Sequence, residues 1–326
     1  MNKWVLALAV AFCTQGAFAE SNSSSQSKLK IEDAKEKTNT TSGEDVDNTI
    51  TNKKLRAESG SKSKYSLATA WNYRGGNLGD PLSEARPNIT GLAGTTDWSN
   101  LSGDVNGKYN VDQRHSWLVG FGVRWISPLY KRTPIGQDKV DADNPVINYQ
   151  YVYKVKGLQN VLQVGPTFHT NTDDREKGYV MDFQVGQTSV YEVPNTKLSI
   201  GVAGQLYGAT FDKSGGYVTQ VDDKDGSVSQ VQRSRTQGDY RLGIFPFVEY
   251  ELTSKINLRT LTGVYWQHTR NVEDAMTFRQ TKVYQSFGVG ISVSRDIFLY
   301  PNVQFIPDST RASDTNVALS ANINAF

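Results

Sequence analysis

Apolar and polar side chains alternate along this chain from residue 63 onward, in segments of about ten residues. In residues 101–111 every even position is polar or charged, while the odd positions hold apolar residues or glycine. Successive side chains of a β-strand point to opposite faces, so each such segment predicts a strand with one dry and one wet face. We therefore predict that the chain is all-β from residue 63 to its end.

The alternation predicts about 12 strands, each near the length that a tilted membrane-spanning strand needs. The connections after the second, fourth, eighth and tenth strands are tight, and the intervening ones are longer. Short turns on one side and long loops on the other are typical of a transmembrane, antiparallel, up-and-down β-barrel, which is the fold class we predict. The candidate strands are 64–73, 101–111, 115–125, 145–156, 160–170, 179–190, 197–209, 240–252, 256–268, 281–294, 297–306 and 315–325.

The first 19 residues have the pattern of a cleavable signal peptide. Lys3 precedes an apolar core at residues 4–12, and the small-residue exit Ala17-Phe18-Ala19 follows it. No later segment approaches the roughly 20 continuous apolar residues that a transmembrane helix needs. Cys13 is the single cysteine, so the processed chain is expected to form no disulfide.

Residues 20–62 contain no aromatic residue and few apolar ones, among them Ile50 and Leu55. Such a segment buries too little apolar surface to offset the entropy of ordering it. We predict a disordered periplasmic tail, with a plug or a cell-wall contact as the alternative. The predicted domains are therefore the signal peptide 1–19, the tail 20–62 and the barrel 63–326.

Aromatic residues recur at spacings that fit a membrane. Trp117 and Trp125 are eight residues apart on one predicted face, which is about 20 Å along the axis of a tilted strand. Tyr240 and Tyr250 are ten residues apart, or about 25 Å by the same geometry. Both spans match an apolar band flanked by aromatic girdles. The predicted girdle is Trp71, Trp117, Trp125, Tyr240, Tyr250 and Trp266.

On these features, residues 63–326 resemble the Gram-negative outer-membrane β-barrel superfamily, in particular porin-like channels of about twelve strands. The resemblance is architectural and includes no short family motif. It implies location in a bacterial outer membrane, contact with its lipid and lipopolysaccharide, and insertion by the barrel-assembly machinery. That machinery recognises a terminal aromatic residue, but Phe326 is out of phase with the apolar face of residues 317–325.

Enzymatic and cofactor functions find little support in the sequence. Only three histidines exist, and His169 is the one predicted to face inward, near Asp173, Asp174 and Asp182. This rim cluster is similar to that of outer-membrane aspartyl-type proteases, but the Asp-x-His element of those enzymes is absent. We predict no enzyme, no metal and no cofactor. The net charge of +2 indicates no nucleic-acid partner.

The predicted inward face holds small residues and an excess of cationic ones. The inward glycines either leave volume in the lumen or relieve strand bending, and both readings stay open. We predict a passive channel for small polar solutes with a weak anion preference. The alternative is a surface structural or recognition protein whose barrel anchors the loops 74–100 and 210–239, and a rim hydrolase is the third. The oligomeric state is not predicted. The predicted pore-lining residues are Arg124, Arg241, Arg259, Lys282, Asp104, Asp182, Gly120, Gly122, Gly288 and Gly290.

Overall fold

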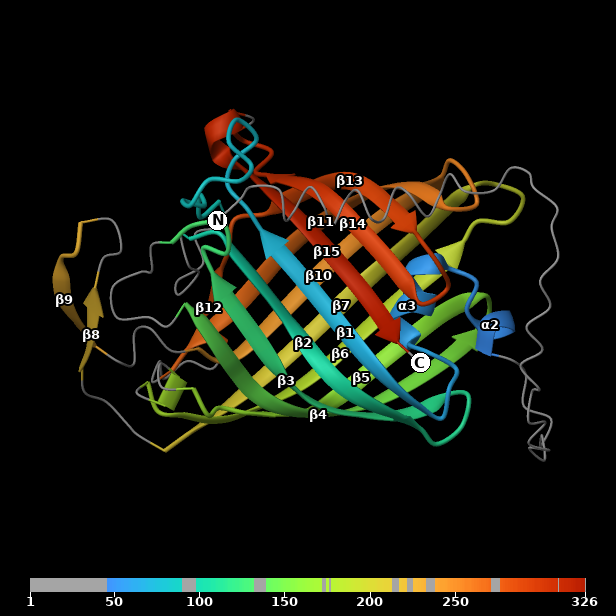
Figure 1. Ribbon diagram of the computed structural model, residues 1–326, viewed down its shortest axis with the longest axis horizontal. Helices are drawn as coiled ribbons and strands as arrows, with labels where there is room; N and C mark the ends of the chain where they lie inside the picture. The colour runs from blue at the N-terminus through green and yellow to red at the C-terminus, as the bar shows by residue number, and fades with distance from the viewer. Residues whose placement is uncertain are drawn as a thin grey trace, which may run out of the picture. The chain divides into compact units, whose positions relative to one another are not determined.

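A computed structural model describes residues 46–89, 98–131, 139–171, 174–175, 177–212, 217–221, 225–232, 238–270, 276–309 and 311–325. The predicted signal peptide, the first part of the predicted tail, Asp173 and Phe326 lie outside these residues. The described part of the chain forms a closed, antiparallel β-barrel of twelve strands, as the sequence predicts (Figure 1).

Each barrel strand pairs with its neighbours in the sequence, which is an up-and-down arrangement. The barrel closes where the first strand pairs with the last, with Trp71 opposite Ala321. The strands are β1 Tyr65–Arg74, β2 Asn100–Asn110, β3 His115–Ile126, β4 Val140–Val155, β5 Leu158–Phe168, β6 Tyr179–Glu192, β7 Leu198–Phe211, β10 Gly238–Glu251, β11 Ile256–Thr269, β13 Tyr284–Ser292, β14 Ile297–Phe305 and β15 Thr315–Ala325.

Three further strands lie outside the ring of twelve. Strand β12, Phe278–Gln280, pairs with residues 266–268 of β11, and β13 pairs with residues 256–263 of the same strand. Strands β8, Tyr217–Val221, and β9, Val228–Gln232, form a separate two-stranded sheet within the long connection from β7 to β10. That hairpin is not among the predicted strands. A 3-10 helix, η1, covers Ala312–Asp314 before β15.

The predicted faces of the strands are confirmed in the burial pattern. On β3, Leu118 is 7% exposed and its neighbour Val119 is 56% exposed. Trp117 and Phe121 share the exposed face with Val119, so large apolar side chains cover the outside of the barrel. An outward apolar belt is what a barrel surrounded by lipid requires.

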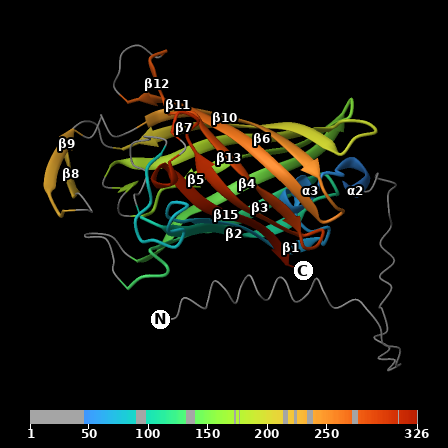
Figure 2. The same ribbon diagram turned by 90° about the horizontal axis from the view of Figure 1, so that it is seen from above.

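The two ends of the barrel differ, as the connection lengths predict. At one end, short turns at 111–114, 156–157, 193–197, 252–255 and 293–296 join the strands, and we call it the short-turn end. Strand β1 begins there and β15 ends there. The opposite end carries the longer connections, and we call it the long-loop end (Figure 2).

Residues 46–61 were predicted to belong to a disordered tail, with a plug or a cell-wall contact as the alternative, and in the structure they are ordered. This inserted segment contains helix α2, Val46–Thr49, and helix α3, Lys53–Ser59; α3 lies inside the short-turn end of the barrel, and α2 lies at its rim (Figures 1 and 2). Ile50 and Leu55 are completely buried there. The burial of these few apolar side chains against the barrel wall offsets the entropy of ordering so short a segment.

Candidate functional site

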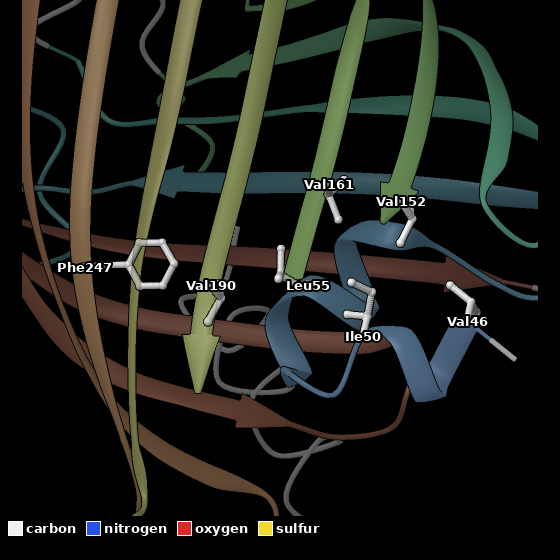
Figure 3. Packing of buried hydrophobic residues seen from close by; sticks show 7 residues of the cluster. All are labelled: Val46, Ile50, Leu55, Val152, Val161, Val190 and Phe247. Atoms are coloured by element: carbon white, nitrogen blue, oxygen red, sulfur yellow. The ribbon is translucent and has the colours of Figure 1, made fainter. Parts of the chain in front are cut away.

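The inserted segment packs against the inner wall of the barrel through an apolar cluster (Figure 3). Ile50 and Leu55 project from the segment toward side chains of β4, β5, β6 and β10. The wall contributes Val152, Val161, Val190 and Phe247. A second contact joins Ala57 of α3 to Phe298 and Tyr300 of β14. The segment therefore reaches opposite sides of the lumen and lies across it.

Asn52 joins helix α3 to a buried ion pair. Its Oδ1 accepts a hydrogen bond from the backbone N–H of Leu55 at 3.1 Å, which caps the helix. Its Nδ2 donates to Glu249 Oε2 at 2.7 Å. Glu249 also binds Arg259, and the two side chains are 3% and 2% exposed. A buried ion pair needs further hydrogen bonds to offset its lost hydration, and Asn52 supplies one.

Barrel side chains also bind the backbone of the inserted segment. Gln159 Oε1 accepts from the backbone N–H groups of Thr51 and Asn52, both at 2.9 Å. At the other end of α3, carbonyl groups that have no partner within the helix accept hydrogen bonds from the wall. These pairs are Ala57 with Asn324, Glu58 with Gln150, and Ser59 with Lys108.

Arg295, in the turn between β13 and β14, holds the two ends of the inserted segment together. Its Nε lies 2.9 Å from Asp47 Oδ1 in α2, and its Nη1 donates to the carbonyl of Gly60 at 2.7 Å. Lys62 adds a contact of 2.6 Å to Asp47. Gly60 has a φ of +82°, a conformation that suits glycine at the end of a helix.

A cavity of about 450 Å³ lies inside the barrel next to the inserted segment. Ala57 and Glu58 of α3 line it on the short-turn side. Its charged lining groups among the described residues are Glu58 and Asp104. Amide side chains dominate the rest of the wall, among them Asn106, Asn144, Asn148, Gln163, Gln184, Gln205, Asn322 and Asn324.

The charged residues predicted to line a pore occupy different places in the structure. Asp104 lines the cavity. Arg124 lies on the lumen face of β3 but within 3.3 Å of Asp141, so its charge is balanced. Arg241 lies on the lumen face of β10, beside Tyr207 and Gln267 in the register.

Two predicted pore residues differ from the expectation. Arg259 is on the lumen face but is buried in its ion pair with Glu249, because the inserted segment covers it. Lys282 is exposed in the break between β12 and β13, outside any strand. The alternation that placed Lys282 on the lumen face therefore does not apply to it.

Most of the predicted inward glycines do not open the lumen. A Cβ at Gly120 would lie 2.0 Å from the carbonyl oxygen of Val105 and 2.5 Å from Asn106 Oδ1. Gly288 and Gly290 are covered in the same way by Asn302 and Asn257, which stand opposite them on neighbouring strands. These glycines allow a close approach of an amide side chain. Gly122 lines the cavity.

The six predicted girdle residues all lie on the outward face of their strands by the register. Trp117 and Tyr250 are near the short-turn end, and the other four are nearer the long-loop end. The sequence analysis missed a group of outward rings at the short-turn end, in which His115 stacks on Tyr151 at 4.6 Å and Tyr151 on Tyr153 at 4.9 Å. The tyrosines at every second position of β4 were the feature of the sequence that could have predicted this group.

His169, at the long-loop end, lies between two carboxylates. Its Nδ1 is 2.7 Å from Asp174 Oδ2. Its Nε2 is 3.0 Å from Asp182 Oδ2, and this contact is an ion pair without hydrogen-bond geometry. Asn144 and Asn171 donate to the same Asp174 oxygen. Burial lowers the pKa of His169, but the two carboxylates raise it by more, to about 9. The two carboxylates therefore favour the charged form of the imidazole at neutral pH.

No group of three or more histidine, cysteine and carboxylate side chains able to hold a metal ion occurs among the described residues. No helix in the same part of the chain is long and apolar enough to cross a membrane.

No protein-family model matches the sequence, and no curated protein matches it. Among solved structures the chain is similar to a COG4313 outer membrane channel from Pseudomonas putida F1, at 10% identity and a TM-score of 0.46, over 82% of this chain and 97% of that one. It is also similar to the NanC porin, at 9% identity and a TM-score of 0.39, over 80% and 98%. Salmonella typhi OmpF in complex with daunomycin matches at 7% identity and a TM-score of 0.34, over 82% and 98%.

Proposed function

We propose that the protein is a bacterial outer-membrane channel for small polar solutes, and that the inserted segment occludes its periplasmic end. The supporting observation is that the cavity in the lumen ends at Ala57 and Glu58. These residues belong to a short helix held by side-chain contacts, and not to the hydrogen-bonded wall. Movement of that helix connects the cavity to the short-turn end without breaking any strand pairing.

The outward apolar belt and the short-turn end support the proposed location and orientation. Short turns face the periplasm in barrels of outer membranes, so the inserted segment enters from that side. Lipid and lipopolysaccharide are the proposed contacts of the belt. Recognition by the barrel-assembly machinery stays a proposal, because it depends on Phe326, which lies outside the described residues.

A weak preference for anions is part of the proposal. Arg241 supports it, because the side chain lies on the lumen face of β10. Asp104 acts against it in the cavity. The balance supports a small preference that depends on ionic strength.

Planar-bilayer conductance tests the proposal. Deletion of residues 46–60 is expected to raise the conductance, because the helix across the lumen is removed. A Thr51→Cys, Gln159→Cys pair, placed where the Thr51 hydroxyl and the Gln159 amide nitrogen are 2.7 Å apart and joined by a short bis-methanethiosulfonate cross-linker, is expected to hold the channel closed until a reductant is added. Thr51→Cys alone is the control. A deletion variant that inserts but conducts no better than the full chain contradicts the occlusion.

A second candidate function is recognition by the external loops, with the barrel as their anchor. The β8–β9 hairpin favours it, since it is an ordered element in a long connection that a simple channel does not need. Deletion of residues 217–232 separates the candidates. A channel keeps its conductance without the hairpin, whereas a recognition protein loses its binding activity.

A further inference from the structure

We propose that the lumen cavity is a binding site for neutral polyhydroxylated solutes, that is, sugars and sugar alcohols. This inference rests on the proposed channel function and names the class of solute. It follows from the chemistry of two adjoining parts of the lumen wall, one rich in amides and one rich in aromatic rings, which share strand β7.

The amide part of the wall suits hydroxyl groups. Strands β2 and β4 to β7 place Asn106, Asn148, Gln163, Gln184 and Gln205 along the cavity. A side-chain amide offers both donors and acceptors, and a hydroxyl group does the same, so each can satisfy the other. The cross-strand contact of Gln184 Nε2 with Asn148 Oδ1 is long, at 3.4 Å, which leaves both groups able to exchange it for a better partner.

The aromatic part of the wall lies on strands β7, β10, β11 and β13. A Cβ at Gly243 would lie 2.9 Å from ring atoms of both Phe245 and Tyr265. One at Gly263 would lie 2.4 Å from the ring of Tyr284. The rings therefore lie over inward glycines, close to the wall, and the aromatic ring that lines the cavity itself is that of Tyr207 on β7. Apolar C–H faces of a sugar ring pack on such surfaces while its hydroxyl groups point away.

The two parts meet at one level of the barrel. Gly243 stands opposite Gln205 on one side and opposite Tyr265 on the other, so an amide and an aromatic ring flank the same position. Tyr207 lines the cavity on the same strand as Gln205, and its hydroxyl donates to Gln205 Oε1 at 3.1 Å. A molecule bound in the cavity therefore contacts amide side chains and the ring of Tyr207.

The charges favour a neutral solute over an anion or a cation. Asp104 and Glu58 are the two carboxylates that line the cavity, and Asp104 repels anions, whereas the charge of Glu58 is balanced by an ion pair. Lys54 binds Glu58, and Arg241 stands beside Tyr207 in the register, so cations gain little. The volume of about 450 Å³ falls within the range of small-molecule sites, roughly 300–1,000 Å³.

Saturation-transfer NMR on the refolded full chain tests the site, with sucrose as the neutral probe, gluconate as the anionic one and glucosamine as the cationic one. Saturation is expected to reach sucrose most strongly. Gln163→Leu with Gln205→Leu is expected to weaken sucrose binding about fivefold or more for each hydrogen bond lost. Tyr207→Ala is expected to weaken it as well, because the ring of Tyr207 lines the cavity.

Gln285→Leu is the matched control, because Gln285 shares the outward face of β13 with the exposed Phe287. The shift in gel mobility on boiling reports folding of each variant, and Tyr207→Phe keeps the ring if Tyr207→Ala does not fold. Sucrose signals that persist in the double variant, or stronger transfer to gluconate or glucosamine, overturn the inference. If deletion of residues 46–60 opens a conducting channel but sucrose receives no saturation, the channel stands and the sugar site is refuted. Sucrose binding without any conductance refutes the channel alone.

Discussion

The side-chain amide of Asn52 donates to Glu249 Oε2 over 2.7 Å, so the residue that caps helix α3 also binds the barrel wall. The two roles use different atoms, since Oδ1 accepts from the backbone of Leu55. Helix order and docking of the inserted segment are therefore coupled at one side chain. The carboxylate that receives the bond is also the partner of Arg259, which packs 3.9 Å from the ring of Phe247.

Substitution of Asn52 is expected to separate capping from docking. Asn52→Ala removes both, and the loss of the cap alone costs about 1 kcal/mol. Asn52→Ser keeps a good cap but lacks the reach to Glu249, so it isolates the docking contact. We expect the open probability in planar bilayers to rise in the order wild type, Asn52→Ser, Asn52→Ala. Equal behaviour of the serine variant and the wild type would show that the contact with Glu249 does not hold the segment.

The strands were predictable because their signal is local. Period-two alternation needs no knowledge of the partner strand, and Val119 with Leu118 shows that it also assigns the faces. The inserted segment was not predictable in the same way. Ile50 and Leu55 meet Val161 and Phe247, which are more than 100 residues away in the sequence. Averaged over residues 20–62, the composition does not reveal the short stretch that Ile50 and Leu55 order by their burial against the barrel wall.

For the lumen residues, the sequence predicted only the face of the strand on which each side chain lies. Alternation placed Arg259 inward but did not show that Glu249 stands directly opposite it and that Asn52 covers the pair. It placed Gly120 inward but did not show that Asn106 fills the space in front of it. Both facts depend on the register between strands, which one sequence alone does not specify.

Gly120→Ala is expected to destabilise the barrel, although it adds one methyl group on an inward face. The added Cβ would lie 2.0 Å from the carbonyl oxygen of Val105, so the backbone has to shift. Overpacking of this kind typically costs about 1–3 kcal/mol. Gly204→Ala on β7 is the matched control, since nothing lies within 4 Å of its added Cβ. Urea titrations of the two variants in lipid vesicles measure the difference, and equal midpoints would contradict this packing.

His169 is expected to titrate well above an ordinary histidine. Its pKa of about 9 lies above the unfolded value near 6.5, so its contribution to stability is complete below about pH 6.5 and is lost as the pH rises through about 9. NMR of the labelled histidine rings between pH 5 and 10 measures the midpoint. Asp174→Asn removes one carboxylate and is expected to lower it. A midpoint at or below 6.5 in the wild type would exclude the charged arrangement.

Arg241 is expected to contribute to the ion selectivity of the channel once the inserted segment is removed. Deletion of residues 46–60 takes Glu58 away and removes the Ser59 carbonyl that binds Lys108, so Lys108 adds a second cation near the short-turn end, whereas the pair of Arg259 and Glu249 that the deletion uncovers carries no net charge. Arg124 lies within 3.3 Å of Asp141 and is balanced in the same way. Arg241 on β10 then opposes Asp104 near the cavity, and a narrow lumen with low-dielectric walls focuses their fields.

Reversal potentials of the deletion variant under a salt gradient measure this selectivity. We expect a weak anion preference near 0.1 M salt that fades toward 1 M, because the Debye length falls from about 10 Å to about 3 Å. Arg241→Gln is expected to shift the preference toward cations. The double variant Arg124→Gln, Asp141→Asn removes one cation and one anion together and is expected to leave the reversal potential unchanged. If the Arg124→Gln, Asp141→Asn double variant shifts the reversal potential and Arg241→Gln does not, the ions pass along β3 and β4, and Arg241 does not line their path.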